Sequence, residues 1–133
     1  MFDFLQQNLM LIAVIVIATV ALILPMINAR RYAPELTPKK AIEMMNNRKA
    51  QVVDIRQSED FKRGHVAGSL NYPVEKIQGM LNKLDRKRPV ILIDQTGVGS
   101  RPVAKQMRVA GFEEVYILEA GLIGWFKEKL PLE

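Results

Sequence analysis

The feature that most restricts this chain is a long uncharged stretch near its N-terminus. No Asp, Glu, Lys or Arg occurs between Leu5 and Ala29, and residues 9–27 are apolar almost without interruption. As a helix these 19 residues rise about 28 Å, close to the hydrocarbon thickness of a bilayer. A buried core helix is shorter as a rule and amphipathic. We therefore predict a transmembrane helix over residues 9–28, preceded by a short N-terminal segment, residues 1–8.

A cleaved signal peptide is the main alternative for such a stretch. Signal peptides begin with basic residues and end at a small-residue cleavage site. This chain begins Met-Phe-Asp and leaves the apolar stretch through Pro-Met-Ile-Asn-Ala-Arg-Arg. The two flanks therefore favour a permanent single-pass anchor.

The charges on either side of the apolar stretch predict its orientation. Asp3 is the only charged residue before it, whereas Arg30 and Arg31 follow it directly. By the positive-inside rule, the N-terminus lies outside and the C-terminal domain is cytoplasmic, at the inner (plasma) membrane. Residues 29–36 form a basic juxtamembrane linker, in which each cation adds about 1 kcal/mol of attraction to anionic headgroups. The lipid bilayer is thus an expected partner.

The amino-acid composition excludes several kinds of chemistry. The 133 residues include no cysteine and one histidine, His65, so disulfides, thiolate metal sites and a cysteine nucleophile are impossible. No metal ion or cofactor is expected. The net charge of +5 has a membrane explanation, and neither aromatic platforms nor a nucleic-acid-binding motif is present. We therefore expect no nucleic-acid partner.

The rest of the chain alternates between strand-like and helix-like segments. The continuous apolar run at residues 89–94 predicts a strand covered on both faces. Thr37 followed by Pro38 predicts a capped helix start. Further strands are predicted over residues 51–55 and 115–118, and helices over residues 38–47, 58–63 (capped, and ended by Gly64), 74–84, 100–110 and 122–129. This alternation predicts an α/β domain with a mainly parallel sheet over residues 37–131.

The loop after the central strand, residues 94–101, is the best candidate for a site. In parallel sheets, ligands bind beyond the carboxyl ends of the strands, and a helix N-terminus there suits an anion. A dinucleotide fingerprint fails because its third glycine position is Pro102, and a phosphate-binding P-loop fails for lack of Gly-Lys-Ser/Thr. The letters Asp-Gln-Thr-Gly are also similar to an aspartyl-phosphate loop, but the second acid of that motif and a metal-binding segment are absent.

Two segments resemble the signatures of the rhodanese-like domain family. Residues 54–73, with Asp-Ile-Arg and Gly-His-Val-Ala-Gly, are similar to the first signature, and residues 111–125 to the C-terminal one. Order and spacing agree, and the resemblance covers about residues 37–131. It implies a three-layer α/β fold. The whole chain is similar to a group of bacterial single-pass membrane proteins that carry one such domain.

The resemblance also identifies what has changed in the active-site loop. Active rhodaneses hold sulfane sulfur as a cysteine persulfide in a loop of the form Cys-x-x-Gly-x-Arg-Ser, and here Asp94 occupies the cysteine position and Gly99 the arginine position. Arg101, two places further along, is not expected to substitute. A carboxylate cannot form a persulfide, so no catalytic residue is expected. Our hypothesis is that Asp94 caps the loop N–H groups from within, by at most about 2 kcal/mol. The predicted binding loop comprises Asp94, Gln95, Thr96, Gly97, Val98, Gly99 and Ser100.

Other conspicuous residues have structural interpretations. We expect His65 to satisfy loop backbone groups rather than act as a base, and Asp54 and Arg56 to form a local ion pair. Three aromatic residues are expected in the core: Phe61, Phe112 and Trp125. A basic cluster is interpreted as a solvated face that could meet lipid or an acidic partner: Lys83, Arg86, Lys87 and Arg88.

These observations favour a membrane-anchored, catalytically degenerate rhodanese-like domain that acts as a protein-binding or adaptor module. The expected partner is a membrane or membrane-associated protein, because confinement to the membrane raises effective concentration. Two enzymatic alternatives remain. The domain could serve a sulfur relay that uses a partner's thiol, or Asp94 could act as nucleophile or base of a hydrolase.

Overall fold

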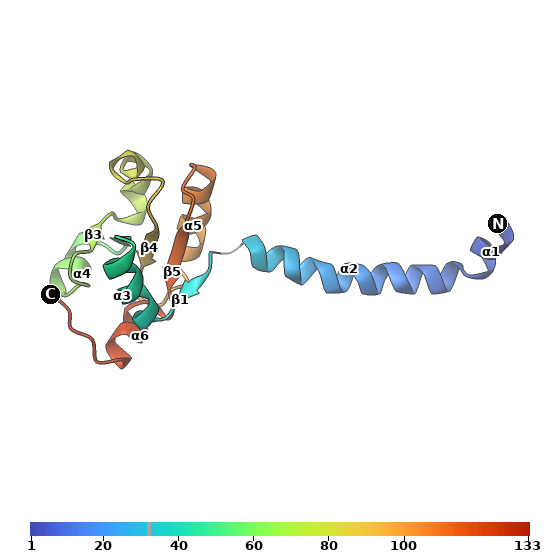
Figure 1. Cartoon of the computed structure of the whole chain (residues 1–133), viewed down its shortest axis with the longest axis horizontal. Coiled ribbons are helices and arrows are strands. Elements are labelled where there is room, and N and C mark those ends of the chain that lie inside the picture. Colours follow the sequence, from blue (N-terminus) through green and yellow to red (C-terminus); the bar gives the residue numbers. More distant parts are fainter. Residues whose placement is uncertain (32) are drawn as a thin grey trace. The chain divides into compact units, whose positions relative to one another are not determined.

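The structure is a computed structural model that describes residues 1–31 and 33–133 (Figure 1). The chain divides into two compact units, Met1–Tyr32 and Ala33–Glu133.

Over residues 1–31, the described part of the first unit, the chain forms the helices α1 (Phe2–Gln7) and α2 (Leu9–Arg31). The predicted apolar helix is present as α2, and Pro25 lies within it without ending it. The stretch Leu9–Ile27 has a mean hydropathy of 3.0 and is not buried, so α2 is long and apolar enough to cross a membrane. The short helix α1 was not predicted. It ends at Asn8, whose side chain donates to the Phe4 carbonyl at 2.8 Å.

The second unit is built on a five-stranded parallel sheet with the strand order β1-β5-β4-β2-β3. Leu92 on the central strand pairs with Val53 on one side and Ile117 on the other. The strands are β1 (Glu35–Leu36), β2 (Gln51–Asp54), β3 (Leu70–Asn71), β4 (Val90–Ile93) and β5 (Val115–Leu118). The helices are α3 (Pro38–Asn47), α4 (Ser58–Arg63), α5 (Ser100–Val109) and α6 (Gly121–Lys127), with the 3₁₀ helices η1 (Val74–Gly79) and η2 (Leu81–Lys83).

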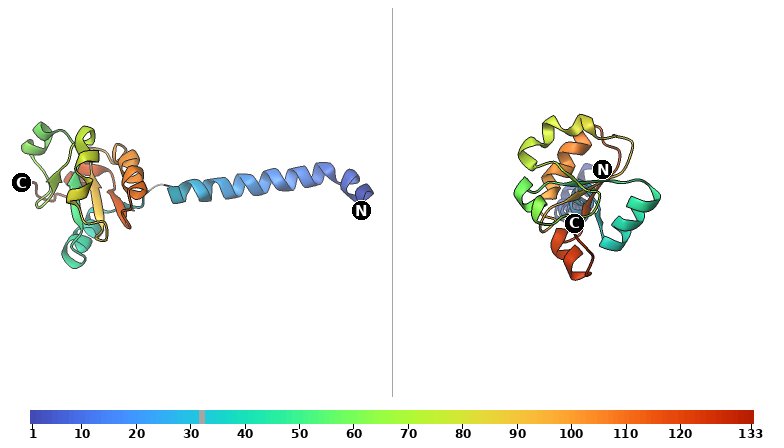
Figure 2. Two further views of the ribbon diagram at one scale, coloured as in Figure 1. Left: turned by 90° about the horizontal axis from the view of Figure 1, so that it is seen from above. Right: turned by 90° about the vertical axis from the view of Figure 1, so that its left-hand side faces the viewer.

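Both faces of the sheet are covered, which gives three layers (Figure 2). Alternate residues of β4 enter different cores: Val90 and Leu92 pack with the residues of α5, η1 and η2. Ile91 and Ile93 pack with those of α3 and α6. Because all four residues are buried, the strand reads in sequence as a continuous apolar run. The predicted three-layer α/β fold with a parallel sheet is confirmed.

The structure corrects the predicted linker over residues 29–36. Glu35 and Leu36 form β1, which pairs with β5, and Ala33 is already buried. Two residues are too few to show a strand pattern in sequence, so only the long-range pairing with β5 defines this strand. At the other end, Glu133 exchanges two backbone hydrogen bonds with His65, so the contacts of the domain continue past residue 131.

Two helix predictions were also inaccurate. Residues 74–84 form η1 and η2 rather than one α-helix, with i to i+3 bonds from Met80 to Ile77 and from Leu84 to Leu81. Gly79 lowers helix propensity at the break between them. In α4 the cap residue is Gln57, which makes no side-chain capping bond, and Ser58 is already helical. The Thr37 cap of α3 is confirmed, since Thr37 Oγ1 accepts from the Lys40 amide at 3.3 Å.

Candidate functional site

The loop of residues 94–100 lies at the carboxyl end of the sheet, between β4 and α5. The backbone folds it so that the predicted residues divide into two sets. The side chains of Gln95, Thr96 and Val98 are exposed, whereas Asp94 and Ser100 are buried. The loop therefore presents three side chains outward over a buried carboxylate.

Asp94 is hydrogen-bonded on both carboxylate oxygens. Its Oδ1 accepts from the Gly97 amide at 2.9 Å and from the Ser100 hydroxyl at 2.7 Å, and its Oδ2 accepts from the Gly99 amide at 2.9 Å. The residue is 8% exposed. Hydrogen bonds to a charged group in a buried setting are among the stronger ones in proteins. The hypothesis that Asp94 caps the loop from within is confirmed.

The second departure from the family pattern, Gly99, is coupled to the first. A Cβ atom at position 99 would lie 2.9 Å from Asp94 Oδ2, closer than such atoms approach in proteins. The carboxylate accepts three hydrogen bonds, so moving it away from position 99 would break some of them. Arg101 does not replace the arginine that the family has at position 99, since its guanidinium lies 3.6 Å from the Glu35 carboxylate. In the present loop geometry, Asp94 leaves room only for glycine at position 99.

Helix α6 fixes the loop from the other side through a residue of the C-terminal signature. Gly121 has φ +54°, and a Cβ there would lie 2.3 Å from the Asp94 carbonyl oxygen. This close approach lets the Leu122 amide donate to the Asp94 carbonyl at 3.0 Å, and the Ile123 amide to the Gln95 carbonyl at 3.3 Å. The signature glycine thus holds the loop of residues 94–100 in place, a contact that sequence reasoning missed although the glycine was conspicuous.

The first signature supports the same edge of the sheet through a buried ion pair. Arg56 Nη2 lies 2.8 Å from Asp54 Oδ2, with the two side chains 11% and 0% exposed. The same guanidinium donates to the Gly64 carbonyl at 2.7 Å. Asn71 donates to the carbonyls of Asp54 and Arg56, which ties β3 to the end of β2. The predicted local ion pair is confirmed.

His65 also has the structural role that was predicted. Its Nδ1 lies 2.8 Å from the Phe61 carbonyl oxygen, which can only accept, so this nitrogen carries the proton. The ring stacks on Phe61 at a centroid distance of 3.8 Å. Phe112 and Trp125 are buried core residues, as expected, whereas Phe61 is only partly buried.

A groove of about 930 Å³ lies beside the loop, between residues near α4 and the outer side of α6. Asp94 and Gln95 contribute to its lining, as do the apolar side chains of Ile123 and Phe126. Phe126 is 73% exposed and Ile123 is 41% exposed. Sequence reasoning did not single out Ile123 and Phe126. The signal was their helical spacing: Leu122 and Trp125 form the buried face of α6, and residues 123 and 126 lie on a different face of the same helix. Within residues 1–31 and 33–133, no group of His, Asp and Glu side chains is arranged to hold a metal ion.

Comparison with known proteins agrees with this architecture. The uncharacterized protein YibN of Escherichia coli is 39% identical over 101 residues, which cover 73% of this chain and 70% of that protein. The thiosulfate sulfurtransferase GlpE of Glaesserella parasuis is 36% identical over 99 residues, 74% of this chain and 92% of that protein. The solution structure of the polysulfide-sulfur transferase homodimer from Wolinella succinogenes superposes with a TM-score of 0.65 at 27% identity, and covers 76% of this chain and 78% of that one. The Rhodanese-like domain profile matches residues 37–128, and the chain therefore belongs to the rhodanese-like domain family.

Proposed function

We propose that this protein is a membrane-anchored, catalytically degenerate rhodanese-like module that binds a protein partner at the cytoplasmic face of the inner membrane. The observation that carries the proposal is the state of Asp94. Its carboxylate accepts hydrogen bonds from the Gly97 and Gly99 amides and from the Ser100 hydroxyl. The loop donors that could form an anion-binding cradle are therefore occupied by the protein's own carboxylate, which repels an incoming thiosulfate or phosphate.

Sulfur transfer by the route of the family needs a thiolate nucleophile, and this chain contains no cysteine. The names of the relatives from G. parasuis and W. succinogenes nevertheless describe sulfur transfer. That relationship supports one second candidate, a sulfur relay in which a partner supplies the thiol and this domain holds the donor. In both cases the domain works by binding another protein.

An Asp94-dependent hydrolase has less support from the geometry. A nucleophilic or basic carboxylate needs a lone pair directed at its substrate. Here both oxygens of Asp94 accept hydrogen bonds from its own loop, and the residue is 8% exposed. The bonds hold the carboxylate toward its own loop rather than toward a ligand.

The binding surface in this proposal joins the loop to the groove. Val98 is 61% exposed at the loop, and Phe126 and Ile123 are exposed on the side of α6 that lines the groove. Aromatic side chains are enriched in protein interfaces, and exposed apolar patches on a protein surface mark interaction sites. We expect the partner to insert an apolar side chain into the groove between α4 and α6, beside the loop.

The membrane part of the proposal rests on α2 and its flanking charges. The helix has the length and composition of a membrane span. Only Asp3 is charged before the span, and Arg30 and Arg31 follow it, which supports a cytoplasmic domain. Anchoring would confine the domain to the plane of its partner and raise their effective concentration.

Site-specific photo-crosslinking in native membranes tests the proposal. A photoreactive residue at Val98 should give a discrete protein adduct, and the same residue at Lys39, which is exposed on α3, should not. Phe126→Ala should weaken the adduct at Val98 by tenfold or more, as for a central interface residue, while Val109→Ala, at another exposed apolar position, should leave it unchanged. No adduct at Val98 in folded protein would overturn the proposal. An adduct whose formation requires thiosulfate would instead favour the sulfur relay.

A further inference from the structure

Three loops meet at the edge of the sheet opposite to the Asp94 loop. They are residues 48–50, which lead into β2, residues 84–89, which lead into β4, and residues 110–114, which lead into β5. Because the strands are parallel, their N-terminal ends lie at one edge. Hydrogen bonds join these loops: Arg88 donates to the Lys49 carbonyl at 2.6 Å, and Arg86 donates to the Ala110 carbonyl at 2.9 Å. We call this surface, with the adjoining residues Lys83 and Arg108, the basic edge.

The basic edge contains the whole net charge of the domain. Residues 33–133 include 17 Lys or Arg and 13 Asp or Glu, and the basic edge has seven of the former and three of the latter. The remaining residues of the domain therefore have ten charges of each sign. The cations of the basic edge are Arg48, Lys49, Lys83, Arg86, Lys87, Arg88 and Arg108, and its acids are Asp85, Glu113 and Glu114.

Four of these cations already have structural roles. Arg48 pairs with Glu114, and Arg48 and Arg108 stand at helix C-termini, where a cation is favourable by itself. Arg86 lies over the Phe112 ring, with its guanidinium carbon 5.1 Å from the centroid, and Arg88 holds the Lys49 carbonyl. Lys49, Lys83 and Lys87 are exposed and make no ion pair within the described part of the chain. Among the cations of the basic edge, these three ammonium groups are therefore available to bind an external anion.

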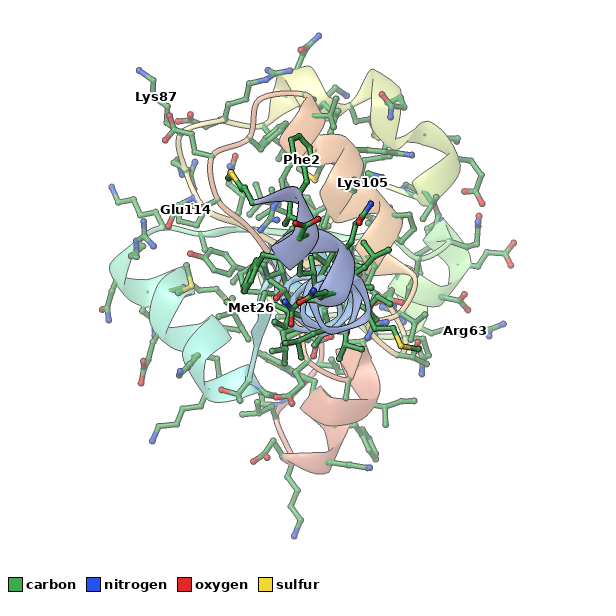
Figure 3. The ribbon with its side chains drawn as sticks, turned by 90° about the vertical axis from the view of Figure 1, so that its right-hand side faces the viewer. Phe2, Met26, Arg63, Lys87, Lys105 and Glu114 are labelled. Atoms are coloured by element: carbon green, nitrogen blue, oxygen red, sulfur yellow. The ribbon has the colours of Figure 1, made fainter. Side chains whose placement is uncertain are left out.

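The backbone holds one of these lysines in an unusual conformation. Lys49 has φ +53°, in the left-handed region that side chains other than glycine rarely adopt. Its carbonyl accepts two hydrogen bonds from the Arg88 guanidinium, at 3.0 and 2.6 Å. Arg88 thus fixes the turn that presents Lys49, and Lys87 comes directly before Arg88 in the chain. Figure 3 shows Lys87 and Glu114 on the same side of the domain, away from Lys105 and Arg63 in that view.

We propose that the basic edge binds anionic phospholipid headgroups through Lys49, Lys83 and Lys87, in addition to the anchoring in the proposed function, on which this inference rests. Charge complementarity favours an anionic surface. The place where the chain enters the domain favours lipid as the source of that anionic surface. β1 is parallel to β5, so Ala33 and Pro34 approach β1 from its N-terminal end, and only five residues separate Ile27, the last residue of the apolar span, from Ala33.

Nucleic acid is the less suitable anion for this surface. Binding to single-stranded RNA or DNA uses exposed aromatic side chains on which bases stack. The one aromatic side chain of the basic edge, Phe112, is 4% exposed and lies under Arg86. Flexible, strongly hydrated ammonium groups on exposed lysines suit a fluid layer of headgroups that fixes no geometry.

The test uses the full chain in lipid nanodiscs. Because the chain has no cysteine, a fluorophore can be attached to one introduced cysteine, at Asn47 beside the basic edge or at Thr96 in the opposite loop. Quenching by headgroup-labelled lipid is measured in discs of phosphatidylcholine and in discs that also contain phosphatidylglycerol. The Asn47 probe should be quenched more in anionic discs, the Thr96 probe equally in both, and the difference should disappear at high salt.

A charge-matched pair of variants isolates the three lysines. Lys49→Gln/Lys83→Gln/Lys87→Gln should abolish the extra quenching at Asn47. Each lysine removed should lower the ratio of headgroup-bound to unbound domain by about fivefold. Lys62→Gln/Lys76→Gln/Lys105→Gln removes the same charge from exposed positions elsewhere and should leave it in place. Both variants should still co-elute with the discs through α2, so loss of anchoring, which would overturn the proposed function, is distinguishable from loss of headgroup binding.

Two results would overturn the inference. The first is equal quenching at Asn47 in neutral and anionic discs. The second is shielding of the Asn47 probe from a soluble quencher by an RNA oligonucleotide in neutral discs, to the same extent and at the same salt as anionic lipid achieves. That outcome would make the basic edge a general polyanion site.

Discussion

Asp94 Oδ2 lies 2.9 Å from the point where a Cβ atom at Gly99 would stand, so the carboxylate at position 94 requires glycine at position 99. Gly99 itself has φ −67° and ψ −19°, a helical conformation that any residue adopts. The restriction at this position therefore comes from the carboxylate and not from the backbone.

The coupling predicts a non-additive double-mutant cycle. Gly99→Ala should destabilise the natural protein because the new methyl displaces a carboxylate held by three donors. In an Asp94→Ser background the same change should cost little, which gives a coupling free energy of about 1–3 kcal/mol. Urea unfolding in detergent, followed by the fluorescence of Trp125, the only tryptophan, reports on the domain. Equal costs in both backgrounds would show that Asp94 does not restrict position 99.

Ser100 should contribute to stability through Asp94. Ser100→Ala removes a buried donor at 2.7 Å from a carboxylate, and we expect a loss of about 1.5–3 kcal/mol. Ser69→Ala is the matched control, because the Ser69 hydroxyl donates at 2.6 Å to the neutral Val66 carbonyl and should cost only about 0.5–1.5 kcal/mol. The same urea titration measures both. A smaller loss at Ser100 than at Ser69 would refute the assigned role.

The buried ion pair of Arg56 with Asp54 should contribute more to the free energy of unfolding than the exposed pair of Arg63 with Asp60. Arg56→Met leaves the Asp54 carboxylate, which is fully buried, without its partner and should destabilise the domain by about 3–5 kcal/mol. Arg63→Met breaks an exposed pair whose atoms lie 3.7 Å apart, and should cost less than about 1 kcal/mol. Similar losses for the two variants would mean that the Asp54–Arg56 pair does not support this edge of the sheet.

Glu114 provides a prediction about pH. Hydrogen bonds from Arg48, and then from Tyr116, lower the pKa of the Glu114 carboxyl below its usual value. A lowered folded-state pKa means that the ionised form favours folding, so this contribution is present above the ordinary glutamate pKa and is lost as pH falls through the folded-state value. An NMR titration of the Glu114 side chain should show this lowered midpoint, and Arg48→Gln should move it back up. An unchanged midpoint in the variant would exclude Arg48 as the main cause.

Sequence reasoning predicted those parts of the fold and site that depend on local patterns. The apolar run of β4 requires cover on both faces, and the Thr37-Pro38 pair defines the start of α3. Asp94 was expected to cap its loop because a short carboxylate placed before two glycines and a helix N-terminus has amide donors within reach. The structure supplies those donors as the Gly97 and Gly99 amides.

The features that could not be predicted depend on residues far apart in the chain. Glu35 and Leu36 become a strand only through pairing with β5. The close approach of Gly121 to the Asp94 carbonyl depends on how α6 packs over the loop. The exposure of Phe126 likewise follows from which side of α6 the core takes, and a short helix with several apolar residues does not reveal that in its sequence.

Sulfur transfer from thiosulfate to an acceptor, measured on the full chain in detergent, tests the central claim most directly. The natural protein should show no turnover above the blank, because Asp94 cannot form a persulfide and fills the cradle. The double variant Asp94→Cys/Gly99→Arg, which removes the carboxylate and restores both family residues together, should acquire activity. Turnover by the natural protein that is lost in Asp94→Asn would contradict the account.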